Sequence, residues 1–234
     1  RLGVEDVTKS VVDIASRVGE NLFWMGRYAE RCEGLARLLR AGLVRMADAE
    51  EEAAALESLT AVTVRLKVFS TREAESGKTI PPQAPPDLVA AVVDPRIPGG
   101  LAANVLRLHG CANQVRERMS TDNWHVFNRL QQRLPGRGAS LGAALESLDE
   151  AMMACVSLAG FAMDDMTRDE SWQFLLLGRR LERLAHLAGV VTHVLALGPG
   201  RRADALEWLL EAANSIVTFR ARYRRGPELL PVLH

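Results

Sequence analysis

Hydrophobic residues recur at three- and four-residue spacing through most of the chain, which places them along one side of a helix. Stretches rich in proline and glycine interrupt the pattern, notably 76–87, 94–100 and 134–140. No stretch alternates hydrophobic and polar residues over a useful length, as a half-buried strand would. The pattern therefore predicts helices over these segments: 16–47, 50–74, 87–93, 100–119, 122–134, 140–163, 171–197 and 203–224.

The fold class that follows from this pattern is all-α, a helical bundle of about six to eight helices. Residues 1–12 are predicted to be a linker or N-terminal extension, and residues 13–234 are predicted to form one helical domain. A division into two domains at the proline-rich connection 76–87 is the alternative. The first residues do not form a signal peptide, because they contain no apolar run and no small-residue cleavage site.

One charged frame, Gly-Arg-x-x-Glu-Arg, occurs twice, as GRYAER at 26–31 and as GRRLER at 178–183. The two copies are offset by 152 residues and lie inside predicted helices. Each is accompanied by a hydrophobic stripe at helical spacing, which is predicted to face the core. In the first helix the stripe is Met25, Tyr28, Ala29, Cys32, Leu35, Ala36, Leu39, Leu43 and Met46. In the second it is Leu177, Arg180, Leu181, Leu184, Leu187, Ala188 and Val191.

The motif itself occupies the other side of each helix. At 100° per residue, Arg27 and Glu30 lie away from the stripe, on a side that also carries Phe23 and Leu38. Bulky apolar residues beside charges indicate that this side is covered as well, and buried charges are tolerated when they are paired. The arginines of one copy can reach the glutamate of the other if the two helices lie side by side.

Two further basic clusters add to this picture. Arg116 lies near the end of the predicted helix 100–119, and Arg220 lies in the last predicted helix. If these arginines converge with the motif residues, they form a polar pocket suited to a carboxylate or phosphate held by two hydrogen bonds. The motif alone leaves open whether it forms an interior polar network or a site for a ligand or partner.

Composition narrows the class of protein. The chain has 29 lysines and arginines and 29 aspartates and glutamates, so its formal net charge is zero. This balance gives no indication of a nucleic acid or an anionic membrane as a binding partner. The most apolar run, 174–197, is interrupted by four charged residues, which excludes a simple membrane span. Three widely spaced cysteines are predicted to be reduced thiols of a cytoplasmic protein. Neither a metal site nor a glycine-rich phosphate loop is predicted.

Four stretches resemble the alpha-E family, a bacterial all-helical family named for its Glu-Arg motif. SRVGENLFWMGRYAERCEGLARLL (16–39) resembles its opening signature, and WQFLLLGRRLERLAHL (172–187) resembles its second motif. Residues 94–130 resemble its middle block, although Leu108-His109-Gly110-Cys111 departs from the usual Ala-Arg-Glu-Asn-like run. Residues 215–233 resemble its C-terminal block.

The resemblance implies a setting of ATP-dependent carboxylate–amine ligation, in peptide or amide-bond synthesis or modification. Alpha-E domains accompany, or are fused behind, a circularly permuted ATP-grasp ligase, and a transglutaminase-like protein often accompanies them. ATP and Mg²⁺ are expected only in that ligase, so no cofactor is predicted for this domain. The first residues fit excision from such a fusion. A small-molecule or peptide substrate is the expected ligand.

By the family motif, the candidate binding residues are Arg27, Arg31, Arg179, Arg183, Glu20 and Asn21, with Arg116 and Arg220 added from the basic clusters. Three hypotheses follow. The domain is an accessory module that binds the ligase or its substrate. Alternatively, it is a catalyst in which Glu30 or Glu182 is the general base and arginines stabilise an anion. In the third hypothesis, the arginines and glutamates only specify the packing of the bundle.

Overall fold

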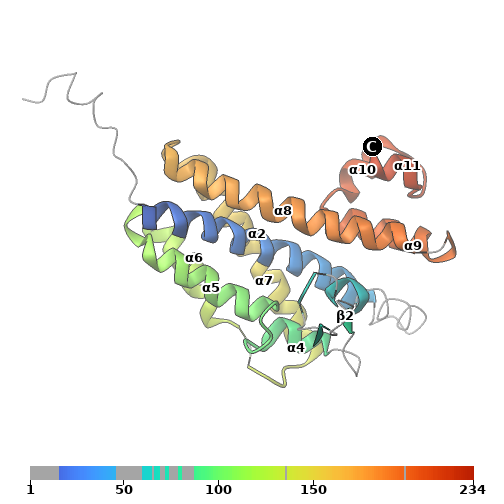
Figure 1. The fold of residues 1–234 in the computed structure, drawn as a ribbon, viewed down its shortest axis with the longest axis horizontal. Helices are drawn as coiled ribbons and strands as arrows, with labels where there is room; N and C mark the ends of the chain where they lie inside the picture. Colours follow the sequence, from blue (N-terminus) through green and yellow to red (C-terminus); the bar gives the residue numbers. More distant parts are fainter. Residues whose placement is uncertain are drawn as a thin grey trace, which may run out of the picture.

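The computed structural model describes residues 16–45, 60–64, 66–68, 72–73, 79–80, 87–134, 136–197 and 199–234. It confirms the all-α fold class (Figure 1). The helices that carry the bundle are α2 (Ser16–Arg45), α4 (Leu88–Val93), α5 (Leu101–Gln114), α6 (Thr121–Gln132), α7 (Leu141–Gly160), α8 (Glu170–Ala196) and α9 (Pro199–Ala212).

Short elements complete the chain. A 3₁₀ turn covers Arg116–Arg118 after α5, and a π-helical turn, Phe161–Asp165, extends α7. The C-terminal end consists of α10 (Ile216–Arg222) and α11 (Leu229–Leu233). Strands β1 (Arg72–Glu73) and β2 (Thr79–Ile80) pair in antiparallel fashion, with Arg72 opposite Ile80 and Glu73 opposite Thr79.

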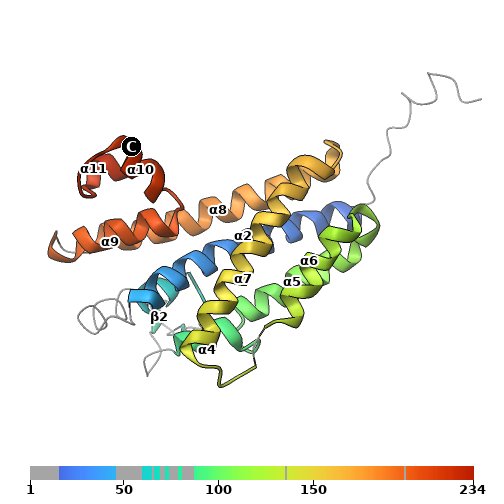
Figure 2. The ribbon, with the colours of Figure 1, turned by 180° about the vertical axis from the view of Figure 1, so that it is seen from behind.

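Helix α2 lies at the centre of the bundle. It packs against α8 on one side and against α5 and α7 on others, and α9 and α4 contact it more locally. Figure 1 shows α8 and α2 side by side, with α5 and α6 beyond α2, and Figure 2 shows α7 crossing α2 on the far face. The predicted α2 stripe is correct through Leu43, since its members are buried apart from the partly buried Tyr28; Met46 lies outside the described residues.

The predicted core stripe of α8 is wrong. Leu177, Leu181 and Leu184 are exposed, and the buried residues of α8 lie on the opposite side of the helix: Ser171, Leu175, Gly178, Glu182, His186, Val190 and Val194. This buried side faces α2. The side that carries the Gly-Arg-x-x-Glu-Arg motif is therefore the covered side of α8, whereas its leucine stripe faces outward.

Several helix boundaries also differ from the predictions. The predicted helix 50–74 is wrong at its end, because residues 66–68 form a turn and 72–73 form β1, although 60–64 are helical. The predicted helix 203–224 is two helices, separated at Asn214, whose φ of 56° is incompatible with a continuous right-handed helix. Helix α6 is capped by Ser120, whose hydroxyl accepts from the Asn123 amide. Helix α11 was not predicted.

Candidate functional site

The two motif helices approach each other at a pair of glycines. A Cβ placed on Gly26 would lie 2.2 Å from the carbonyl oxygen of Leu175, and one on Gly178 would lie 2.1 Å from that of Phe23. Phe23 and Leu175 are themselves 152 residues apart, so the two contacts are equivalent. Any side chain at either glycine would separate the helices, so only glycine permits this approach.

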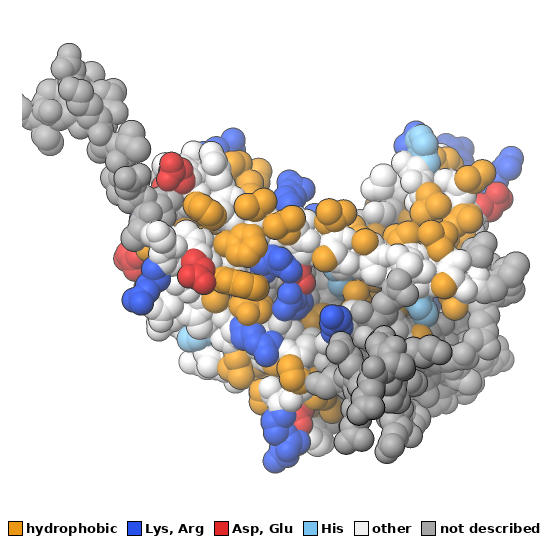
Figure 3. All heavy atoms as spheres, viewed as in Figure 1, with side chains coloured by type: hydrophobic (Ala, Val, Ile, Leu, Met, Phe, Trp, Pro, Cys, Tyr) orange, Lys and Arg blue, Asp and Glu red, His pale blue; other side chains and the backbone are white. Residues whose placement is uncertain are grey.

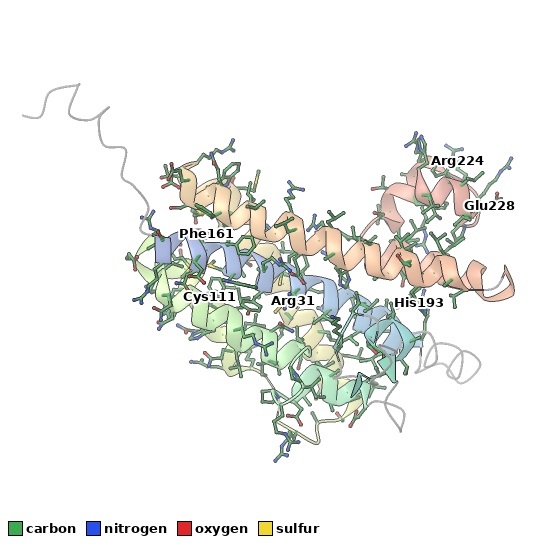
Figure 4. All side chains as sticks on the ribbon, in the orientation of Figure 1. Arg31, Cys111, Phe161, His193, Arg224 and Glu228 are labelled. Carbon is green, nitrogen blue, oxygen red and sulfur yellow. The ribbon has the colours of Figure 1, made fainter. Side chains whose placement is uncertain are left out.

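The helices run in the same direction and in register. Gly34 faces His186, which follows it by 152 residues, and Gly178 follows Gly26 by the same number, so each motif faces the other. Since the motif side chains project from the same face as the glycines, close approach brings arginines of one helix onto the glutamate of the other. Figure 4 labels Arg31, midway along α2 where it runs beside α8.

Glu182 of α8 is held by two arginines of α2. Arg27 Nε donates to Glu182 Oε2 at 2.5 Å. Arg31 donates twice, from Nε to Oε1 at 2.6 Å and from Nη2 to Oε2 at 2.9 Å. The Glu182 side chain is only 9% exposed. This is the two-pronged arginine–carboxylate geometry, which fixes orientation as well as contributing energy.

Glu30 of α2 is held in the same way by two arginines of α8. Arg183 Nε donates to Glu30 Oε1, and Arg179 Nε donates to Glu30 Oε2 at 3.3 Å. Arg179 and Arg183 also lie 3.5 and 3.9 Å from the carboxylate of Glu33. The structure thus brings together all six motif charges as reciprocal ion pairs between the helices, the arrangement expected if the two helices lie side by side.

Burial and pairing oppose each other in setting the pKa values here. Burial alone would raise the pKa of Glu182, but hydrogen bonds and charge from Arg31 and Arg27 outweigh it, so the pKa is lowered. Burial likewise opposes the protonated form of Arg31, and the Glu182 hydrogen bond overcomes this and raises its pKa. Arg183 follows the same pattern with Glu30. All three groups therefore stay charged near neutral pH.

The cluster carries an excess of positive charge. Glu33 also binds Arg37 at 2.9 Å. Five arginines (27, 31, 37, 179 and 183) therefore share three glutamates (30, 33 and 182), which leaves two positive charges. Cation–π contacts with aromatic rings stabilise part of this positive charge. The guanidinium of Arg27 lies 5.9 Å from the ring centres of Phe23 and Trp24. That of Arg31 lies 5.6 Å from the ring centre of Tyr28.

His186 lies at the end of the cluster, buried against Gly34. Its Nε2 has no hydrogen-bond partner among the described residues. Burial lowers the pKa of His186 from 6.5 to about 4, although Glu182 acts in the opposite direction. The imidazole is therefore neutral at physiological pH.

Two cavities meet at His186. One, of about 220 Å³, is lined by residues that include Glu30, Glu33, Arg37 and Arg183. The other, of about 580 Å³, is lined by Arg31, Lys67, Glu182 and His186 together with Leu35, Leu66, Pro98, Gly99, Ala185 and Gly189. Its polar wall holds two cations and one carboxylate. We call this second cavity the Arg31–Lys67 pocket.

Four of the predicted site residues lie away from the cluster. Asn21 donates to the carbonyl of Arg17, and Glu20 is exposed nearer the start of α2. Arg116 donates to the Met119 carbonyl and stacks over Trp124, whereas Arg220 pairs with Glu207 of α9. The predicted convergence of Arg116 and Arg220 with the motif is therefore wrong, because each has a local partner.

Glu33, Arg37 and the two glycines belong to the cluster but were not among the predicted site residues. Glu33 follows Glu30 by three positions and Arg37 follows Glu33 by four, which places them on the same helix face. That spacing was visible in the sequence. Glu33 has no counterpart in the second motif, where Ala185 stands at the equivalent position, so the repeat alone does not indicate Glu33.

A model of the Alpha-E family, described as a predicted alpha-helical domain with a conserved ER motif, matches residues 14–234. The chain belongs to the Alpha-E family. The ER dipeptides at 30–31 and 182–183 thus supply, in this structure, both glutamates and two of the arginines of the reciprocal ion pairs. The resemblance noted in the sequence is confirmed.

Relatives of this Alpha-E chain include uncharacterized proteins of Mycobacterium bovis and Mycobacterium tuberculosis. Each is 30% identical over 224 residues, which cover 88% of this chain and 25% of the relative. The chain therefore spans about a quarter of the length of these curated relatives. No solved structure matches it.

Two searches of the described residues bear on the remaining site classes. No group of three or more histidine, cysteine, aspartate or glutamate side chains there is placed to hold a metal ion. Within the same residues, no helix combines the length and apolar character needed to cross a membrane.

Proposed function

We propose that this Alpha-E domain is an accessory domain that binds the anionic group of a small-molecule or peptide substrate. It would do so in the bacterial cytoplasm for a circularly permuted ATP-grasp carboxylate–amine ligase, fused or separate, with a transglutaminase-like protein as a further partner. The ligase and its reaction come from the family resemblance, and the relatives are long enough to contain further domains. The observation that carries the binding role is the excess positive charge beside the Arg31–Lys67 pocket.

That pocket has the features of a site for a carboxylate or phosphate. Its volume of about 580 Å³ falls in the range of small-molecule sites. Glu182, its one carboxylate, is already neutralised by Arg27 and Arg31. Lys67 is exposed at its wall. An anion in the pocket would interact favourably with the net positive charge of the cluster.

The geometry supports a catalytic role for the glutamates less well. A general base works best with a pKa near the working pH, whereas the pKa of Glu182 is lowered by its two arginines. Both lone-pair sides of the carboxylate are occupied by guanidinium groups. Glu30 is similarly enclosed by Arg179 and Arg183. Proton abstraction by either group would require these pairs to break.

A purely structural role for the ion pairs has one observation in its favour, which is that every motif charge has a partner on the other helix. The two roles are compatible, because a network that fixes α2 against α8 also fixes the wall of the pocket. The ligand role rests on Lys67 and on the unbalanced charge, and these can be tested without disturbing the network.

The test uses inorganic phosphate and acetate as probes of the two anion classes. We expect either anion to raise the melting temperature of the wild-type chain above that in chloride at equal ionic strength. Lys67→Glu should abolish this rise, whereas Arg129→Glu, an exposed change of the same charge on α6, should preserve it. Equal rises for both variants would contradict the proposed pocket. In a reconstituted ligase reaction, Lys67→Glu should raise the KM for the anionic substrate.

A further inference from the structure

The outward side of α8 carries a regular hydrophobic seam. Phe174, Leu177, Leu181 and Leu184 are 42%, 49%, 41% and 67% exposed. Ala188 is exposed and Val191 is partly buried. The six positions are spaced by three, four, three, four and three residues, and none belongs to the buried set of α8. The first of them, Phe174, also lies over Gly19 of α2 with one face of its ring. We call these six residues the α8 seam.

The equivalent positions of α2 show what such a seam does in this fold. Subtracting 152 gives Leu22, Met25, Ala29, Cys32, Ala36 and Leu39, which repeat the same spacing. All of these are 8% exposed or less. Helices α5 and α7 pack against α2 on the sides that do not face α8. The same pattern is therefore a helix-packing surface on α2 and is left open on α8.

The spacing favours a helix as the occupant of the seam. Alternating steps of three and four residues keep hydrophobic side chains on one line when two helices supercoil about each other. The seam spans 17 residue steps, about 26 Å of helix. Figure 3 shows hydrophobic side chains following α8 across the upper part of the molecule, facing solvent.

The positions that flank the seam favour an identical helix. In paired helices, charges beside the hydrophobic line select a partner of complementary charge. Here the flanks are Gln173, Arg180 and Leu187 on one side and Ala185 and Thr192 on the other, so Arg180 is the single charge. A nearly neutral seam offers little to recognise an acidic or basic partner but pairs with its own copy without repulsion. Small residues at 185 and 188 allow close approach.

We propose that the α8 seam is a dimer interface, in which α8 of one chain pairs with α8 of a second copy about a two-fold axis. Pairing would bury the exposed leucines on both chains and leave the arginine–glutamate cluster, on the other side of α8, accessible. None of the six seam residues lines the Arg31–Lys67 pocket, which the interface adjoins only at the flanking Ala185. Its failure would therefore leave the anion-binding proposal untouched.

Analytical ultracentrifugation of the whole chain tests this directly. The wild-type chain should sediment with twice the mass of one chain at concentrations of tens of micromolar. Leu181→Glu and the milder Leu184→Gln should shift the equilibrium toward monomer, with at least a tenfold increase in dissociation constant for Leu181→Glu. The control is Met153→Glu, because Met153 is 68% exposed on α7 and lies outside the seam.

Circular dichroism would establish that each variant keeps its helix content, as expected for substitutions at exposed positions. A wild-type chain that remains monomeric at 100 μM would overturn the proposal. So would a dimer that both seam variants leave as tight as the wild type, since another surface would then form it.

Discussion

Gly26 and Gly178 set the distance between α2 and α8, and every motif ion pair depends on that distance. Each would place a Cβ about 2 Å from a carbonyl oxygen of the facing backbone. Backbone cannot rotate away as the end of a long side chain can, so the helices must move apart. At the residue scale, these two glycines are therefore positions where any larger side chain should destabilise the contact between α2 and α8.

Gly26→Ala is predicted to lower the free energy of unfolding by roughly 1–3 kcal/mol, the usual cost of overpacking. The higher helix propensity of alanine offsets part of the loss. Gly110→Ala is the matched control, because Gly110 is helical, exposed and has no atom within 4 Å of an added Cβ. That change should raise stability by up to about 1 kcal/mol. Urea denaturation measures both, and a stabilising Gly26→Ala would refute the close approach.

His186 is predicted to make stability depend on pH. The folded chain holds it neutral down to about pH 4, whereas the unfolded chain takes up a proton near pH 6.5. The unfolded state therefore binds more protons in this window, and the free energy of unfolding falls by up to roughly 3 kcal/mol as the pH falls from 6.5 to 4. Urea titrations at several pH values give the slope.

His186→Leu should remove this contribution, so its stability should fall less steeply than that of the wild type between pH 6.5 and 4. His125→Leu provides the control for the same change of residue type, because His125 is exposed on α6. Parallel slopes for the wild type and His186→Leu would show that His186 is protonated in the folded state.

At the scale of elements, the ion pairs join α2 and α8 as a unit. Replacing Glu182 with Gln leaves Arg27 and Arg31 without their carboxylate in a half-buried site, which is predicted to cost about 2–4 kcal/mol of stability. In Glu150→Gln, the exposed pair with Arg133 is lost instead, and the cost should be within about 0.5 kcal/mol.

The double variant Arg31→Met with Glu182→Gln should lose less than the sum of the single variants, with a coupling energy of at least about 1 kcal/mol. Chemical denaturation of the four proteins of this cycle provides the measurement. Additive losses would mean that the two side chains do not interact in solution.

The contact between α2 and α8 shows which features of the helices the sequence predicts and which it does not. The bracketing of Arg27 and Glu30 by Phe23 and Leu38 correctly indicated a covered motif face and pairing across helices. The same periodicity wrongly predicted that Leu177, Leu181 and Leu184 are buried. A hydrophobic stripe indicates that one face of a helix is suited to packing, but it does not indicate whether another helix covers that face. The prediction that Arg116 converges with the motif was wrong, because its guanidinium hydrogen-bonds the Met119 carbonyl and stacks on the Trp124 ring. Such nearby partners depend on the backbone path, which spacing does not give.

At the scale of the molecule, α2 contacts α4, α5, α7, α8 and α9, so few parts of the described bundle can unfold without it. We predict one cooperative transition in urea. Tryptophans in four helices report on it separately: Trp24 in α2, Trp124 in α6, Trp172 in α8 and Trp208 in α9. Fluorescence of variants that retain one tryptophan each should give the same midpoint as circular dichroism. Distinct midpoints would favour the two-domain alternative.

Glu30 and Glu182 are 152 residues apart in the sequence, and this separation has a consequence for the protein while it is being translated. A ribosome needs roughly 8–30 s to add that many residues, so α2 is complete long before α8 exists. During this interval α2 can pack its hydrophobic side on α5 and α7, while its future contact with α8 faces water. Arginines and glutamates on the side of α2 that later contacts α8 are well hydrated. Leucines at the same positions would instead expose an aggregation-prone hydrophobic surface on the nascent chain. Charged residues at the contact between these distant helices therefore spare the nascent chain an exposed hydrophobic surface until α8 is made.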